Sequence, residues 1–180
     1  PSKSQAHRLL ILAAFADAPT ELLCSEANRD IEATVNCLNA LGADIRPTDT
    51  GYTVRPVKAL PEKAVLNCCE SGSTLRFLLP VAGALGVDTT FLLEGRLPQR
   101  PLSPMWEEME RMGCSLSRPT PDTIHCAGKL RPGHYTIDGD VSSQYITGFL
   151  LALSLLDAPS TLEITGKLES APYVDLTKDA

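Results

Sequence analysis

One succession of sequence patterns occurs twice in full and begins a third time, and this internal repeat limits the folds open to the chain. In each copy, apolar residues at helical spacing alternate with short strand-like stretches bounded by Gly, Pro and Asp. In the first copy, Gly42 follows the second helical pattern, where helices commonly end. The expected elements of this copy are a helix over 4–16, a strand at Glu21–Cys24, a helix at Asp30–Leu41 and a hairpin of Asp44–Arg46 and Tyr52–Arg55.

The second copy repeats this order, and the third begins with a strand that precedes its first helix. Gly113 closes the second helix of the second copy as Gly42 does in the first. The expected elements of the second copy are a helix at Gly72–Leu85, a strand at Thr89–Leu93, a helix at Pro104–Met112 and a hairpin of Ser115–Arg118 and Thr123–Cys126. Those of the third are a strand at Tyr135–Asp138, a helix at Ser143–Leu155, a strand at Thr161–Thr165 and a second helix that starts near Tyr173.

The repeat predicts one domain of three units, at about 1–58, 59–130 and 131–180, of which the last is incomplete. A unit of this size cannot bury its own apolar face, so the units must stack on one another. Apolar residues make up 43% of the chain, which is enough for a buried core. The pattern leaves open whether the helices lie inside and the sheets outside, or the reverse.

Composition excludes several classes of function. The net charge is -6 and there is no basic block, which argues against nucleic-acid binding. No apolar run is long enough to cross a membrane, and we interpret the basic and apolar opening as mature cytoplasmic sequence. The six cysteines form no C-x-x-C pair and the three histidines lie outside zinc spacing, so we expect reduced core cysteines and no metal.

The residues with binding chemistry lie at the start of the first helix of each unit. These starts are Lys3-Ser4, with Ser4 as the expected N-cap, Ser71–Thr74, and Ser142–Gln144. Backbone N–H groups are unpaired at a helix N-terminus, glycine lets an anion approach them, and serine adds a donor. Each serine alone is more often only a helix cap. The recurrence in three units predicts that the starts converge on one anion site, with the nearby arginines Arg8, Arg76, Arg96 and Arg100 in support.

Five motifs, in one order along the whole chain, resemble those of 3-phosphoshikimate 1-carboxyvinyltransferases, the EPSP synthase family. They are PSKSQAHRLLILAA, CCESGSTLRFLLP, GRLPQRPLSPM, GDVSSQYITGFLLAL and ESAPYVDLT. The resemblance implies an α/β (α+β) fold of repeated βαβαββ units with helices inside and sheets outside. This is the inside-out α/β barrel of the enolpyruvyl transferases, here with a truncated third unit. The chain would be the shikimate-3-phosphate-binding domain of a two-domain protein.

The same resemblance implies the reaction. An enolpyruvyl group passes from phosphoenolpyruvate to the 5-hydroxyl of shikimate 3-phosphate, in the shikimate pathway to chorismate and aromatic amino acids, without a cofactor. The family's proton-transfer groups lie mainly on the other domain, which this chain lacks. We therefore expect no catalytic residue here and no turnover by the chain alone. The full enzyme would be cytoplasmic and monomeric, with no nucleic-acid or membrane partner.

By resemblance, residues of this chain would contact both substrates. Those for shikimate 3-phosphate are Lys3, Ser4, Arg8, Ser142, Ser143, Gln144, Ser170 and Tyr173. Those for phosphoenolpyruvate are Lys3, Gly72, Ser73, Arg100 and Gln144, with Arg76 in support. Two residues depart from the pattern, because His7 and Glu70 stand where many members have Asn, and we expect Glu70 to face away. The retained Gly72 implies a glyphosate-sensitive full enzyme.

Three alternatives remain open at this point. A UDP-N-acetylglucosamine enolpyruvyltransferase would be expected to carry a reactive Cys near Pro101–Met105, and none is there. A non-catalytic phosphometabolite-binding module would bind tightly as a short chain. In a purely structural helical repeat, ligand binding would survive Arg8→Ala and Lys3→Ala. If the site is real, we expect both changes to abolish binding while leaving stability nearly unchanged.

Overall fold

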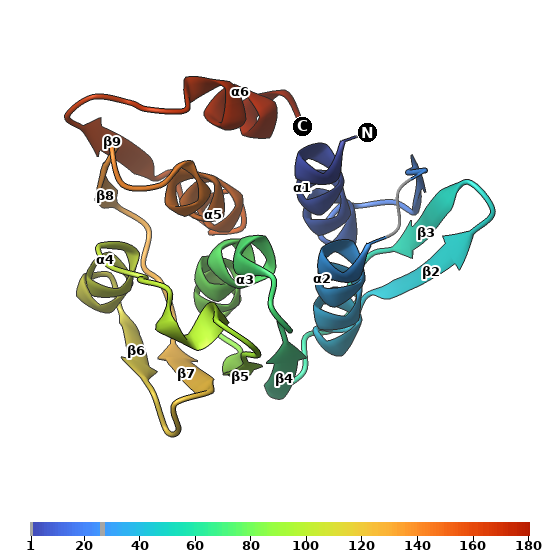
Figure 1. Ribbon diagram of the computed structural model, residues 1–180, viewed down its shortest axis with the longest axis horizontal. Coiled ribbons are helices and arrows are strands. Elements are labelled where there is room, and N and C mark those ends of the chain that lie inside the picture. The colour runs from blue at the N-terminus through green and yellow to red at the C-terminus, as the bar shows by residue number, and fades with distance from the viewer. Residues whose placement is uncertain (1, 26–27) are drawn as a thin grey trace.

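A computed structural model describes residues 2–25 and 28–180, and helices and strands alternate through them (Figure 1). The helices are α1 (Lys3–Ala14), α2 (Arg29–Ala40), α3 (Gly72–Leu85), α4 (Met105–Arg111), α5 (Ser143–Leu153) and α6 (Ala171–Asp179), with a 3-10 turn, η1, at Leu97–Gln99. The strands are β1 (Thr20–Leu23), β2 (Asp44–Thr48), β3 (Gly51–Arg55), β4 (Lys63–Asn67), β5 (Asp88–Leu92), β6 (Cys114–Ser117), β7 (Thr123–Gly128), β8 (His134–Asp138) and β9 (Thr161–Thr165).

Each stretch of the repeat contributes its own sheet. The first sheet is antiparallel with the order β1-β3-β2, and the second has the order β4-β5-β7-β6. In the second sheet, β4 and β5 are parallel, and the hairpin of β6 and β7 adds to β5 in the antiparallel sense. The third sheet holds only the parallel pair β8 and β9. It therefore corresponds to the β4 and β5 half of the second sheet.

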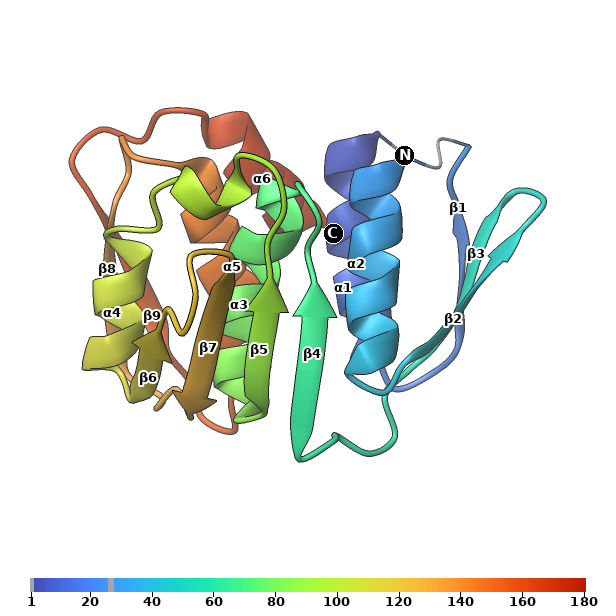
Figure 2. The ribbon, with the colours of Figure 1, turned by 60° about the horizontal axis from the view of Figure 1, so that its bottom comes forward.

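The helices lie inside and the sheets outside, as Figures 1 and 2 show from two directions. Among the described residues the three sheets stay separate and do not close into a barrel. Buried apolar side chains from all three units form one core, including the rings of Phe77, Tyr135, Tyr145 and Phe149. Five cysteines (Cys24, Cys37, Cys68, Cys114 and Cys126) are buried in this core.

Local chemistry explains where the key helices start, stop and meet. Ser2, rather than the expected Ser4, caps α1, and it does so in a capping box with Gln5. Gly86 ends α3 in the left-handed conformation that glycine adopts without strain. Gly148 lets α5 approach α3 closely, because a Cβ atom there would lie 2.3 Å from the backbone oxygen of Arg76. The starts of α3 and α5 are thereby brought together.

The strand β4 is the main element that the sequence pattern did not predict. Ala64 and Leu66 point into the core, but Val65 between them is 59% exposed. An apolar residue on the outer face hides the alternation of a half-buried strand, and five residues give little other signal. The remaining predicted elements occur, with ends displaced by one or two residues.

No helix within residues 2–25 and 28–180 is both long enough and apolar enough to span a membrane.

Candidate functional site

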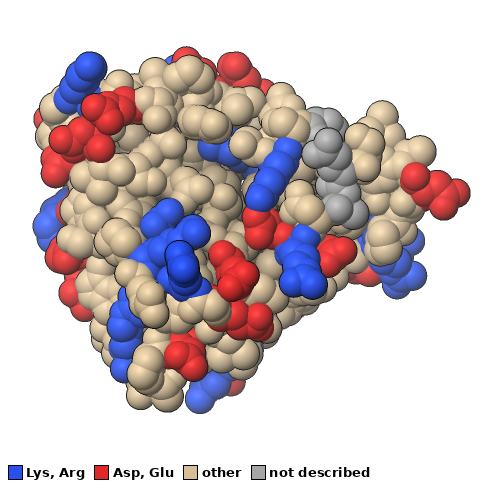
Figure 3. Space-filling model, viewed as in Figure 1, with Lys and Arg blue, Asp and Glu red and all other residues tan. Residues whose placement is uncertain are grey.

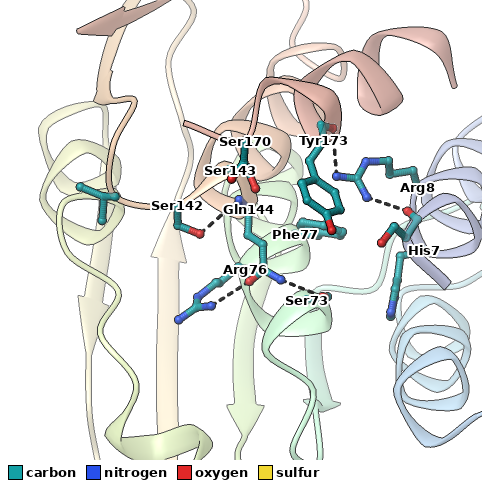
Figure 4. Close-up of a pocket in the computed structure, with 12 residues that line it drawn as sticks. His7, Arg8, Ser73, Arg76, Phe77, Ser142, Ser143, Gln144, Ser170 and Tyr173 are labelled. Carbon is teal, nitrogen blue, oxygen red and sulfur yellow. Dashed lines mark hydrogen bonds between the residues drawn. The ribbon is translucent and has the colours of Figure 1, made fainter. Parts of the chain in front are cut away.

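The helices α1, α3, α5 and α6 surround an open pocket of about 420 Å³ (Figure 4). This volume suits a small metabolite. The side chains around it come from all three units of the repeat. They are Ser4, His7, Arg8, Ser73, Arg76, Phe77, Val141, Ser142, Ser143, Gln144, Ser170 and Tyr173. The first helices of the three units thus contribute to one hollow, although they are far apart in the sequence.

Arg8 is the most deeply buried cation of the pocket, with 2% of the residue exposed. Its Nε donates to Thr177 Oγ1 at 2.7 Å, and its Nη2 donates to Thr147 Oγ1 at 3.0 Å. Further bonds go to the carbonyl oxygens of Ser4, at 2.6 Å, and Tyr173, at 3.2 Å. The guanidinium therefore fastens α6 to α1 and α5 at the pocket wall.

The positive charge of Arg8 has no anionic partner in the described structure. None of its described hydrogen bonds goes to a carboxylate, and burial lowers the pKa of the guanidinium. Within residues 2–25 and 28–180, no Asp or Glu lines the pocket, although the whole chain has a net charge of -6. Figure 3 shows the hollow with Lys and Arg side chains at its margins, and some Asp and Glu side chains lie beside them outside the hollow. A pocket with unneutralised cations and no acid favours an anionic ligand.

The start of α5 contributes hydroxyls and an amide. Ser142 caps the helix and accepts from the backbone N–H of Gln144 at 3.2 Å. The Gln144 side chain joins the two units: its Oε1 accepts from Arg76 Nη1 at 2.7 Å and its Nε2 donates to Ser73 Oγ at 2.9 Å (Figure 4). Arg76 also lies over the Tyr145 ring, 5.5 Å from its centroid. These contacts orient Arg76 and Gln144 before any ligand arrives.

The start of α6 closes the pocket from the third side. Ser170 precedes the helix with φ of 59°, and its side chain forms no capping bond, so its hydroxyl is not used to cap the helix. The Tyr173 residue is 47% exposed, while its backbone oxygen is held by Arg8. Both residues line the pocket. Their position depends on the Arg8 contacts that tie α6 to the rest of the domain.

Three of the predicted binding residues do not line this pocket. Lys3 instead forms an ion pair with Asp30 at the start of α2. Gly72 and Arg100 lie together just beyond Arg76: a Cβ atom at Gly72 would be 2.8 Å from Arg100 Nη1 and 3.7 Å from Arg76 Nη1. Arg100 lines a separate, open hollow formed with the β6–β7 turn. Gly72 and Arg100 therefore adjoin the pocket on its α3 side.

Three residues that line the pocket, His7, Phe77 and Val141, were not predicted from the sequence to take part in it. His7 is 1% exposed, and burial lowers its pKa from 6.5 to about 4 against the smaller opposing effect of Asp30. The imidazole is therefore neutral at pH 7. The sequence feature that could have identified His7 as a pocket residue is its spacing, because position 7 follows Ser4 by three residues on the same helix face.

Comparison with known proteins decides the family. The EPSP synthase (3-phosphoshikimate 1-carboxyvinyltransferase) family matches over residues 1–180. The chain belongs to the EPSP synthase family. The 3-phosphoshikimate 1-carboxyvinyltransferase of Clostridium kluyveri is 41% identical over 99% of the chain, and that of Brachyspira hyodysenteriae is 35% identical over 98%. In both relatives the match covers 42% of the relative's own length, so the chain spans about two fifths of each EPSP synthase.

Solved structures show the same fold. An EPSP synthase from Acinetobacter baumannii matches 98% of the chain and 40% of its own length, with a TM-score of 0.79 at 21% identity. The enolpyruvyl transferase NikO from Streptomyces tendae matches 92% of the chain and 38% of its own length, with a TM-score of 0.61 at 13% identity. The arrangement of helices inside and sheets outside is thus that of the enolpyruvyl transferases.

No group of three or more His, Cys, Asp or Glu within residues 2–25 and 28–180 could hold a metal ion.

Proposed function

We propose that the full-length protein transfers the enolpyruvyl group of phosphoenolpyruvate to the 5-hydroxyl of shikimate 3-phosphate, and that this chain supplies the shikimate 3-phosphate site. The observation that carries this proposal is the pocket at the three helix starts. Its described lining contains two arginines and no acid, while the whole chain has a net charge of -6. Membership of the EPSP synthase family supports the choice of ligand.

The pocket chemistry suits a phosphorylated, hydroxylated carboxylate. Arg8 and Arg76 provide cations on opposite sides, and the serines of α5 and α6 provide hydroxyl donors between them. Arginine binds phosphate and carboxylate groups through a planar fork, which fixes orientation as well as charge. We assign shikimate 3-phosphate to Ser4, Arg8, Ser142, Ser143, Gln144, Ser170 and Tyr173.

The second substrate would occupy the adjoining α3 side. The first turn of α3 begins at the buried Gly72, whose missing side chain leaves room for the guanidinium groups of Arg100 and Arg76. We place the second anion beside these two arginines, with Ser73 and Gln144 between the two sites. Lys3, which we assign to both substrates, would exchange its ion pair with Asp30 for a substrate oxygen. An exposed ion pair of this kind is weak enough to be exchanged.

Catalysis would require a second domain of the full-length polypeptide. Among the described residues, no Asp, Glu or Lys lines the pocket, so the groups there that could transfer a proton are neutral His7 and the Tyr173 phenol. Domain closure would bring in acids and lysines and exclude water. The isolated chain would therefore bind shikimate 3-phosphate and release no phosphate from phosphoenolpyruvate.

Backbone amide shifts of the 180-residue chain during a titration with shikimate 3-phosphate test the binding proposal. We expect saturable shifts at Ser4, Ser142 and Ser170 together, and none with UDP-N-acetylglucosamine at the same concentrations. Phosphate release with both substrates tests the requirement for a second domain. Turnover by the isolated chain would refute that requirement, and equal shifts with the nucleotide sugar would refute the choice of substrate.

A further inference from the structure

A buried chain of hydrogen bonds connects the pocket wall to the start of α3. His7 Nδ1 lies 2.8 Å from Thr34 Oγ1 on α2, which lies 2.8 Å from Thr74 Oγ1 on α3. Thr74 Oγ1 then lies 2.7 Å from Ser71 Oγ, the N-cap of α3. The four residues are between 0% and 2% exposed. The first turn of α3 is thereby linked to α1 through side chains that are shut from solvent.

The two ends of this series of hydrogen bonds lie at the pocket and at the start of α3. At one end, His7 lines the pocket, and its buried Nε2 has no hydrogen-bond partner among the described residues. Figure 4 shows the His7 ring on the pocket wall beside Arg8. At the other end, Ser71 accepts from the backbone N–H of Thr74 and so fixes the turn that presents Gly72. An unpartnered buried nitrogen requires an explanation, and a ligand provides one.

The protons that form these side-chain hydrogen bonds can be arranged in two ways. Thr34 has one hydroxyl proton and two neighbours, His7 Nδ1 and Thr74 Oγ1. If Thr34 donates to His7, the neutral ring carries its proton on Nε2, and Thr74 donates to Thr34. If His7 Nδ1 donates to Thr34, Nε2 is a bare acceptor, and Thr74 is left to donate to Ser71 or to the Asp30 carbonyl oxygen. The ring tautomer and the hydroxyl directions therefore change together.

We propose that His7 is a positioning residue whose tautomer reports occupation of the pocket to the N-cap of α3 through Thr34 and Thr74. A phosphorylated carboxylate in the pocket favours the tautomer with N–H on Nε2, because that tautomer presents a donor to an anion. The bond from Thr74 then turns from the α3 cap toward Thr34. Binding of the first anion thus alters the turn that carries Gly72, next to the place of the second. This inference rests on the proposed function for the identity of both ligands.

The surroundings of His7 favour the neutral form of its imidazole. Lys3 and Arg8 lie near enough to oppose a further positive charge, and burial opposes it more strongly. Asp30 acts in the other direction with a smaller effect. The ring therefore exchanges between neutral tautomers near pH 7 without gaining a proton.

Imidazole nitrogen NMR of the wild-type 180-residue chain tests the proposal directly. Nitrogen frequencies distinguish a protonated from a bare ring nitrogen. We expect saturation with shikimate 3-phosphate to increase the fraction of His7 protonated at Nε2 at least twofold, in parallel with the amide shifts of Ser142 and Ser170. An unchanged tautomer ratio while those amides shift overturns the relay and leaves the proposed function standing. Absence of the amide shifts overturns the proposed function as well.

A matched pair of variants at Thr34 tests the path. Thr34 does not line the pocket, and Thr34→Val keeps the β-branched shape but removes the hydroxyl, whereas Thr34→Ser retains the hydroxyl. We expect Thr34→Val to reduce the substrate-induced amide shift of Gly72 at least twofold while Ser142 and Ser170 still respond, and Thr34→Ser to restore it. A full Gly72 response in Thr34→Val overturns the path. Thr74→Val, measured in parallel, removes the next hydroxyl in the same series of hydrogen bonds.

Discussion

Arg8 and Arg76 both lie about one turn into a helix whose start faces the pocket, but the fold surrounds them differently. Arg8 is 2% exposed and donates to side chains and carbonyl oxygens of α1, α5 and α6. Arg76 is half-buried, donates to Gln144 and to the Pro101 carbonyl oxygen, and has a buried Nε without a partner in the described structure. On the α1 side, the proposed binding residue Arg8 therefore also attaches α6 to the domain. On the α3 side, Arg76 makes fewer hydrogen bonds to the protein.

Substitution of Arg8 should have the largest effect. From the sequence we expected Arg8→Ala to leave stability nearly unchanged, but the structure places this side chain in the core. Arg8→Ala would leave the hydroxyls of Thr147 and Thr177 short of a donor and detach α6. We expect a loss of about 3 kcal/mol or more, because bonds to charged groups are worth roughly 1.5–3 kcal/mol each. Urea unfolding and amide exchange of Tyr173–Thr177 measure it.

The control for Arg8→Ala is Arg76→Ala. The same change at the half-buried arginine should reduce stability by less than about 1 kcal/mol and leave exchange in α6 unaltered, because no Arg76 hydrogen bond reaches α6. Equal destabilisation by the two variants would contradict the distinction between the two sides of the pocket.

Acid should weaken the α1 side through His7. The pKa of His7 is about 4 in the folded chain and 6.5 when exposed, so the unfolded state binds more protons between these values. Stability is therefore complete above pH 6.5 and decreases as the pH falls toward 4. The contribution is about 3 kcal/mol at most, from about 1.4 kcal/mol per pKa unit.

The unfolding free energy of the wild-type chain minus that of His7→Gln, measured from pH 7 to pH 4, isolates this contribution from the carboxylates. A difference that stays constant across the range would show that His7 is not held neutral by burial.

The contrast between the arginines also shows what sequence could predict. The repeat located the starts of α3 and α5, where Ser71 and Ser142 cap the helices, because a helix start depends on a few neighbouring residues. The one cap that was named from the sequence, Ser4, was wrong, because Ser2 caps α1. Spacing alone could not distinguish Arg8 from Arg76, since Arg8 is buried by contacts with α6, whose residues Tyr173 and Thr177 lie 165 and 169 positions further along. The same limit applies to His7, whose partner Thr34 is on another helix.

Ligand affinity should respond to Arg76 more than stability does. Arg76→Gln keeps a polar group but removes the charge opposite Arg8. We expect the Kd for shikimate 3-phosphate to rise about tenfold, which corresponds to about 1.4 kcal/mol. Amide-shift titration measures the Kd, and Arg96→Gln, at an exposed position outside the pocket, is the matched control. Equal affinities in the two variants would exclude Arg76 from the site.

Gly72→Ala should have the smallest effect on stability and should separate the two anion positions. The new Cβ atom would meet Arg100 Nη1 at 2.8 Å, the far end of a flexible side chain that can move away. We expect unfolding free energy within about 0.5 kcal/mol of wild type, since alanine also favours the helix. The Arg100 side-chain resonance should shift, while the Kd for shikimate 3-phosphate stays within about twofold.

Gly148→Ala is the structural counterpart of this last change. There the new Cβ atom would lie 2.3 Å from the backbone oxygen of Arg76, which cannot move without separating α3 from α5. Overpacking of this kind costs about 1–3 kcal/mol, and it should weaken shikimate 3-phosphate binding because Gln144 and Arg76 move apart. If Gly72→Ala weakened shikimate 3-phosphate as much as Gly148→Ala, the start of α3 would belong to the first anion's site, and the division between the two sides would fail.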